Sequence, residues 1–470
     1  MTAATLAPPP AVKAKTRPMA LILVAIGIPT FMVTLDNLVV STALPVIRTD
    51  LGASLQSLQW FVNAYTLPFA AFLLTAAAIG DRIGRRRMFL AGLVVFTLAS
   101  AAAGLATESW QLTAARAIQG LGGAAVMPLA LTLLAQAVPE NRRTAAVGIW
   151  GGISGLGVAV GPVVGGAVVT GLDWHWIFFL NVPVGVLAVI MVATVLGESR
   201  GAAKRLDPLG LVLSSAGTLL IIWGVVDGPS HGWGSARILS MLIGGGALVL
   251  AFLAWQRRNS TPMLPLTLFR SRGFSLVNVV QLTFSAGTFG AVFLLSQFFQ
   301  VVQSTTPLQS GLRTLPWTAA PMIVAPLAGI FGDRIGSRNL IVAGQVLLTG
   351  AILWMGLTTT ADVPYTHLIG AFVMAGVGMG LTFSPISTLA LNSVNAEERG
   401  VASGTNNTIR ELGVAAGVAA LASIFSSYGS FASHQSFVDG LRPAVLVGAA
   451  IVGAGAIVAV FLPGRRSLQR

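Results

Sequence analysis

The 470-residue sequence has no cysteine, only four histidines and few charged residues, which make up 9% of the chain. Without cysteine there are no disulfides, iron–sulfur clusters or thiolate metal sites, and the scattered histidines match no metal-binding spacing. A soluble domain carries about 25% charged residues, so this chain cannot cover an ordinary water-facing surface. A hydrophobic share of 54% also excludes a disordered chain. The sequence therefore predicts an integral membrane protein with many spans.

Long apolar stretches are what the chain has in abundance. Each helical span needs roughly 20 apolar residues, and no alternating pattern supports a barrel. The stretches predict an all-α polytopic protein with fourteen spans, at 20–42, 58–79, 88–106, 111–136, 145–170, 175–196, 208–226, 237–255, 274–300, 310–331, 339–357, 367–391, 402–426 and 443–462. The run from Met19 is too long for a signal-peptide core, so it is expected to be the first span.

The basic residues set the orientation of these spans. With both termini in the cytoplasm, 22 of the 28 lysines and arginines fall in cytoplasmic segments, and four fall outside. An error of one span would scramble this partition. The net charge of +13 is therefore interpreted as a topology signal and not as a nucleic-acid-binding surface. We expect a multi-pass protein of the cell membrane with cytoplasmic termini.

Two repeated sequence motifs indicate a duplication. The turn Gly-Asp-Arg-Ile-Gly starts at Gly80 and again at Gly332, 252 residues later, and a second motif runs from Arg143 to Gly148 and from Arg399 to Gly404. Duplicated halves that rock about a central site are typical of transporters. The expected domains are a tail (1–18), a six-helix bundle (19–200), two linker helices (201–258), a second six-helix bundle (259–463) and a tail (464–470).

The duplicated turn is a candidate gate. Its glycines permit a tight backbone path, and its aspartate can accept hydrogen bonds from a neighbouring helix N-terminus. Its arginines can bind anionic headgroups or carboxylates of the other half. We expect a latch that holds the cytoplasmic side closed; pure topology signalling is the alternative. The candidate gating residues are Gly80, Asp81, Arg82, Gly84, Arg85, Arg86, Asp333, Arg334 and Gly336.

Four charged residues lie within predicted spans, beyond their terminal turns: Asp36, Arg116, Arg410 and Glu411. An arginine in hydrocarbon costs about 2.5–3.5 kcal/mol, so Arg116 should face the interior and find an acidic or carbonyl partner, unless it snorkels to an interface. A carboxyl balanced between desolvation and a nearby arginine can exchange protons near neutral pH. The alternatives are a fixed helix-end role for Asp36 and a permanent ion pair for Glu411. Neighbours on a helix point about 100° apart, so Arg410 and Glu411 are expected to have different partners.

Span 5 carries a dense glycine face. Glycines allow close helix contact, and a proline bends a helix by removing one backbone hydrogen bond. We interpret the pattern as a hinge and seal, with generic small-residue packing as the alternative. The motif consists of Gly157, Gly161, Pro162, Gly165 and Gly166.

These motifs resemble the major facilitator superfamily, most closely its fourteen-span drug:proton antiporters of the EmrB/QacA type. The resemblance covers essentially the whole chain and rests on LDNLVVSTALP, the GDRIGRRR turn, RAIQGLGGAA, GVAVGPVVGG, WHWIFFLNVP and NNTIRELG. It implies that Asp36 is the first-helix acid, Arg116 the proton-relay arginine and the span-5 glycines the antiporter motif that marks exporters. Departures are Ala77, His175 and Glu411, where the family has Gly, Arg and Gln; the last leaves open whether Asp36, Glu411 or both carry the proton.

The function expected is proton-driven export of lipophilic or cationic drugs, with dedicated export of one metabolite or antibiotic as the alternative and solute uptake less favoured. No enzyme constellation and no phosphate-binding loop is present, so the expectation is a monomeric transporter without cofactor, powered by the proton gradient. Substrate should bind between the halves, through aromatic, Met and amide side chains. The candidates are Phe31, Met32, Trp60, Asn63, Gln297, Trp317 and Asn406.

Overall fold

The chain, seen in a computed structural model, is described for residues 18–464 except 54, 202–206, 261 and 396–397, and these residues form helices without any strand. The N-half comprises α1 (Met19–Asp50), α2 (Leu55–Ile83), α3 (Arg85–Gly104), α4 (Ser109–Ala137), α5 (Glu140–Gly171), α6 (Trp176–Phe179) and α7 (Asn181–Val195). The C-half comprises α10 (Arg272–Val301), α11 (Pro307–Ile335), α12 (Ser337–Thr358), α13 (Tyr365–Asn392), α14 (Arg399–Tyr428) and α15 (His434–Val460). Between them lie α8 (Pro208–His231), α9 (Ala236–Arg258) and the short η1 (Leu266–Arg270).

The prediction of an all-helical, multi-pass protein is confirmed. Among the described residues, thirteen helical stretches are long and apolar enough to cross a membrane. In α5, which is 32 residues long, the apolar stretch found among the described residues is the shorter Ala145–Gly157, so the count of fourteen stays a prediction. Several helices run beyond the predicted spans, and α1 continues to Asp50. Hydropathy detects only the part of a helix that lies in hydrocarbon, whereas the backbone remains helical beyond it.

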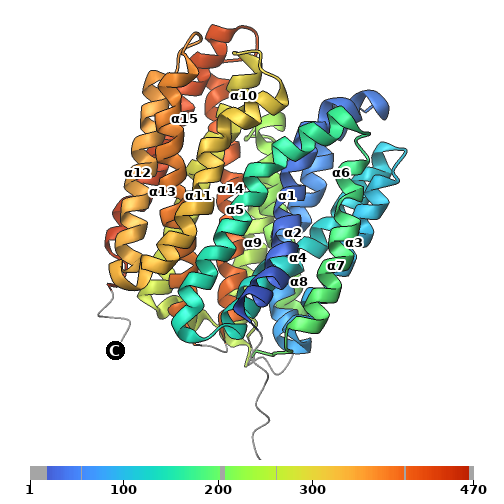
Figure 1. Cartoon of the computed structure of the whole chain (residues 1–470), viewed down its shortest axis with the longest axis vertical. Coiled ribbons are helices and arrows are strands. Elements are labelled where there is room, and N and C mark those ends of the chain that lie inside the picture. The colour runs from blue at the N-terminus through green and yellow to red at the C-terminus, as the bar shows by residue number, and fades with distance from the viewer. Residues whose placement is uncertain (1–17, 54, 202–206, 261, 396–397, 465–470) are drawn as a thin grey trace, which may run out of the picture.

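The two halves repeat one packing scheme. In the N-half α1 packs on α5, α2 on α4, and α3 on α4 and α7; in the C-half α10 packs on α14, α11 on α13, and α12 on α13 and α15. Gly84 after α2 and Gly336 after α11 both have positive φ, +124° and +90°, a conformation that favours glycine. The described chain ends, before α1 and after α15, lie on one side of the molecule, here called the terminal side (Figure 1).

The inserted helices α8 and α9 pair with each other, and α8 also contacts α2 and α14. Ile222 of α8 is buried with Leu67 of α2, next to Leu412 of α14. At its start, α8 is capped by Asp207, which accepts hydrogen bonds from the backbone N–H of Gly210 and from the side chains of two α9 residues, Trp255 and Gln256. Burial raises the pKa of Asp207, but these bonds outweigh it and leave the pKa below its ordinary value. The hairpin is thus a fixed unit that touches both halves.

Candidate functional site

A buried polar cluster in the N-half centres on Asp36 of α1, whose side chain is fully buried. Its Oδ2 accepts a hydrogen bond from Arg116 Nη1 of α4 at 2.5 Å. Its Oδ1 accepts from Gln119 Nε2 at 2.9 Å and from Asn181 Nδ2 of α7 at 2.8 Å. Arg116 is fully buried too, so it faces the interior with an acidic partner, as the cost of a charge in hydrocarbon requires.

A second layer holds these side chains in position. Ser100 of α3 accepts hydrogen bonds from Gln119 and Asn181, each at 2.9 Å. Arg116 Nε donates to the Phe61 carbonyl oxygen of α2 at 3.1 Å, and the guanidinium lies 4.3 Å from the centre of the Tyr65 ring. Five helices, α1, α2, α3, α4 and α7, therefore contribute to one network around one carboxylate.

Sequence reasoning assigned no role to three members of this cluster, Gln119, Asn181 and Ser100. Asn181 stood only as a letter in a family motif, although a lone amide at the start of a strongly apolar helix was a usable signal. Ser100 gave no signal, because serine is common within membrane helices and which face of α3 meets α4 is fixed by packing.

The same location in the C-half can be identified from matching backbone contacts. Gly120 of α4 packs on the Tyr65 carbonyl oxygen, and Gly376 of α13 packs on that of Trp317. Glycine contacts of the same kind align α1 with α10, α3 with α12 and α7 with α15. By this alignment the positions of Asp36, Ser100, Arg116, Gln119 and Asn181 correspond to Gly287, Ile352, Phe372, Ala375 and Ala449.

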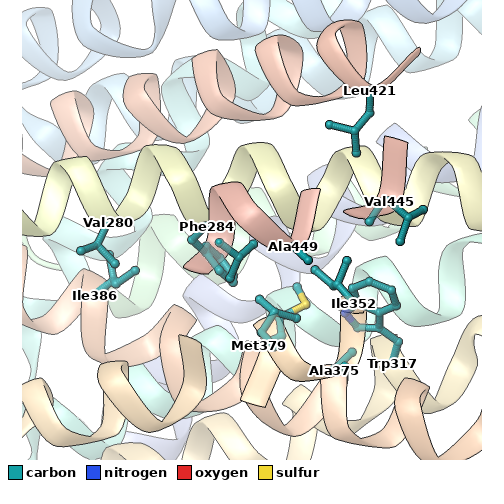
Figure 2. Close-up of a cluster of buried hydrophobic side chains, with 14 of the residues drawn as sticks. Val280, Phe284, Trp317, Ile352, Ala375, Met379, Ile386, Leu421, Val445 and Ala449 are labelled. Atoms are coloured by element: carbon teal, nitrogen blue, oxygen red, sulfur yellow. The ribbon is translucent and has the colours of Figure 1, made fainter. Parts of the chain in front are cut away.

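The corresponding C-half position is therefore apolar throughout. Figure 2 shows Trp317, Ile352, Ala375 and Ala449 in one cluster of buried hydrophobic side chains. Phe372, which replaces the arginine, lies edge-on to Trp317 with ring centroids 5.7 Å apart. At these five matched positions, only the N-half carries charged side chains.

The second acidic residue within a span, Glu411 of α14, is arranged differently from Asp36. Its Oε1 accepts from Nη2 of the adjacent Arg410 at 2.9 Å, so the expectation that the two would have different partners is wrong. Long side chains can curl toward each other even though their Cβ atoms diverge around the helix. Both side chains are 11% exposed, whereas Asp36 and Arg116 are 0% exposed.

At the turn between α2 and α3, the buried Asp81 pairs with Arg85 at 2.5 Å. The Asp81 carboxylate lies directly against Gly400 in the first turn of α14, which belongs to the other half. Arg87 pairs with Glu198 after α7, so these ion pairs stay within the N-half and do not cross to the C-half. Arg82 is exposed and Arg86 half-buried; in the C-half Arg334 is exposed, and the Asp333 side chain lies outside the described set.

The glycine face of α5 contacts two helices. Gly157 packs on the Phe31 carbonyl oxygen of α1, and Gly166 packs on Leu308 of α11. Nearer the terminal side, Gly148 and Gly152 pack on the backbone of α11, so α5 and α11 join the halves. Gly161 and Gly165 are buried, while the side chain of Pro162 lies outside the described set.

The predicted substrate residues lie in several environments. Met32 is buried in the N-half core and Trp317 in the C-half core. Asn406 donates to Asn278 of α10, and Phe31, Asn63 and Gln297 are half-buried. Trp60 lies edge-on to Trp223 of α8, 5.4 Å away, and lines a cavity of about 660 Å³ between α2, α4 and α8. Trp60 therefore faces the linker helix.

Two halves that repeat one packing scheme, a buried charged cluster in one of them and glycine-lined contacts between them define a membrane transporter of the alternating-access class. The sequence profile of the Major Facilitator Superfamily matches residues 26–418 and also 300–469. The chain belongs to the major facilitator superfamily.

Named relatives and solved structures agree with this membership. The chain is 37% identical to the multidrug resistance protein Stp of Mycobacterium tuberculosis, over 88% of this chain and 77% of that protein. It is 36% identical to the tetracenomycin C resistance and export protein of Streptomyces glaucescens, over 86% of this chain and 76% of that protein. The solved proton:xylose symporter XylE has the same fold, with a TM-score of 0.69 and 14% identity, over 95% of this chain and 96% of that one.

Proposed function

We propose that this protein is a proton-coupled antiporter that exports lipophilic or cationic drugs by alternating access, as a fourteen-span transporter of the EmrB/QacA type. The observation that carries the proposal is the fully buried Asp36, held by Arg116, Gln119 and Asn181. An ionisable residue at membrane depth is a functional candidate by default. The similarity to multidrug and antibiotic resistance proteins supports drugs as the substrate class.

Asp36 is the proposed proton carrier and Arg116 the residue that controls it. The arginine favours the charged carboxylate, and burial favours the neutral acid, so a small movement of α1 against α4 changes which form is preferred. Gly157 packs on the backbone of α1 close to Asp36. A movement of α5 would therefore shift the Asp36 carboxylate. Arg410 and Glu411 form the proposed second, less buried charge pair.

The proposed cycle uses the contacts between the halves as gates. On the terminal side, Asp81 lies against Gly400 and Ala77 against Gly404, so α2 and α14 meet there. We infer that the terminal side is cytoplasmic and that these contacts close it while the opposite side releases substrate. The proposal also includes the domain limits predicted from the sequence, a monomeric state and the lack of a cofactor. It places the substrate site between the halves.

Dedicated export of one antibiotic is the second candidate. The similarity to an export protein named for tetracenomycin C favours it, since that name gives a single compound. Competition among chemically unrelated substrates in one transport assay separates the two functions. A multidrug exporter will show mutual inhibition, and a dedicated one will not.

The test of the proposal is transport in proteoliposomes under an imposed pH gradient, with ethidium as the lipophilic cation. Wild-type protein should move ethidium against its gradient and release protons in return. Asp36→Asn should abolish the gradient-driven movement while still binding ethidium, with binding that no longer rises with pH. Gradient-driven transport at the wild-type rate by Asp36→Asn would reject Asp36 as the proton carrier.

A further inference from the structure

A second cavity lies on the terminal side of the C-half, far from the Asp36 cluster. Its volume is about 560 Å³, and it is bounded by the starts of α10 and α12 and the ends of α13 and α15. Its polar lining is Ser271, Arg272, Arg338 and Ser393, and its apolar lining is the segment 460–463. Among the described residues that line it, none is acidic.

The two arginines of this cavity stand where a positive charge is unfavourable. Arg272 is the first residue of α10 and Arg338 the second of α12, and neither helix has an acidic residue in its first turn. A helix N-terminus carries about half a positive charge, which repels cations. Within the described part of the chain, no carboxylate forms an ion pair with either arginine.

In the N-half the positive charge at the corresponding location is neutralised by an acidic residue of the protein. At the start of α3, Glu198 accepts hydrogen bonds from the backbone N–H groups of Arg86 and Arg87 and pairs with the Arg87 side chain. A Cβ on Gly84 would touch that carboxylate, whereas a Cβ on the equivalent Gly336 would meet no atom within 4 Å. After α15 the sequence offers three arginines and no acid.

We propose that this cavity binds the phosphate group of an anionic phospholipid. The phosphate would occupy the position that Glu198 has in the N-half, between Arg272 and Arg338. The Ser271 hydroxyl is a further donor to it, whereas the Ser393 hydroxyl donates to the Leu389 carbonyl oxygen. Phe461, which is 56% exposed, and Val460, which is 45% exposed, lie beside it and suit the start of an acyl chain. Basic pockets between membrane helices bind anionic lipid headgroups in this way.

The experiment measures lipid retention by native mass spectrometry on the full chain in mild detergent, titrated with phosphatidylglycerol. Replacing both arginines, R272Q/R338Q, should weaken retention of the first lipid roughly thirty-fold, as expected for two arginines near a surface. R272K/R338K should retain it to within about three-fold, because a phosphate accepts a point charge. The matched control is R258Q, which removes an exposed arginine at the end of α9, outside the cavity.

Three retention results would each overturn the proposal. They are equal retention by R272Q/R338Q and wild type, an equal loss with R258Q, and equal retention of phosphatidylcholine by the wild-type protein. Displacement of the lipid by millimolar inorganic phosphate would identify free phosphate as the ligand and also reject a lipid site. If R272Q/R338Q does not fold, the comparison of phosphatidylglycerol with phosphatidylcholine on the wild-type protein still decides.

Discussion

The two halves of this transporter share one helix arrangement but differ in the chemistry of their centres. In the N-half a carboxylate, a guanidinium, two amides and a hydroxyl from four helices meet. In the C-half the corresponding side chains are apolar or absent, and Trp317 and Phe372 fill the space. The two halves thus share backbone contacts, such as Gly120 on Tyr65 and Gly376 on Trp317, but at the matched positions the charged side chains stand in the N-half alone.

This difference implies a division of labour. A desolvated ion pair contributes little to stability compared with an apolar pair of the same volume. Such a pair is therefore expected where function needs it, and the half without it is free to optimise packing. We infer that the N-half couples transport to protons and that the C-half provides a rigid counterpart.

The largest effect is expected from breaking the charged pair and its apolar counterpart in parallel. Arg116→Met leaves Asp36 buried without its cation, which costs about 3–5 kcal/mol. Gradient-driven transport should fall by about 100-fold or more. Phe372→Leu, at the corresponding position, should lower stability by about 1 kcal/mol and leave coupling intact. Transport rates in proteoliposomes and thermal unfolding check both; equal loss of coupling in the two variants would contradict the division of labour.

A smaller difference is expected from the matched glycines. An added methyl group at Gly120 or Gly376 collides with a backbone carbonyl oxygen, so each alanine variant should lose about 1–3 kcal/mol of stability. Only Gly120→Ala displaces Tyr65, whose ring lies under Arg116, and it alone should slow transport by about ten-fold. Unfolding midpoints of the two alanine variants measure the equal loss of stability. Rates of ethidium efflux measure the unequal loss of transport. A Gly376→Ala protein that is equally slow would point to packing as the cause.

Glu411→Gln should have a still smaller effect. The carboxylate is more exposed than that of Asp36 and is paired with its own neighbour, so its loss should slow transport only a few-fold. The pH dependence of ethidium efflux should keep its wild-type shape. A flat pH profile in this variant would move the proton site to α14.

The smallest effect concerns Asp207, between the halves. Its pKa is lower in the folded protein than in the unfolded chain, so its contribution to stability is present above the unfolded pKa. That contribution is lost as the pH falls through the folded pKa. Asp207→Asn should therefore lower the unfolding temperature by a few degrees at pH 7, with a gap that narrows below about pH 4. A gap that widens in acid would contradict the capping role.

Much of this organisation could be predicted from the sequence. The repeat of the Gly-Asp-Arg-Ile-Gly motif predicts two halves. The glycine at the end of each motif predicts a tight turn, and Gly84 and Gly336 have the positive φ that such a turn requires. Arg116 could be assigned an interior partner because a charge in hydrocarbon has few alternatives.

What could not be predicted depends on how each helix is rotated about its own axis. Trp60 was expected to contact substrate between the halves, yet it packs on Trp223 of an inserted helix whose position the sequence does not specify. Ser100 and Asn181 join the cluster only because α3 and α7 present one particular face to α4 and α1. Long-range packing decides these contacts, and the local sequence pattern does not predict that packing.

The most direct measurement is proton release on substrate binding, followed with a pH indicator in lightly buffered detergent solution. Wild-type protein should release protons when ethidium binds near neutral pH, because substrate and proton compete for one carboxylate in the N-half. Asp36→Asn should bind ethidium without releasing protons, and Glu411→Gln should release them as wild type does. Proton release that persists in Asp36→Asn and disappears in Glu411→Gln would contradict the account.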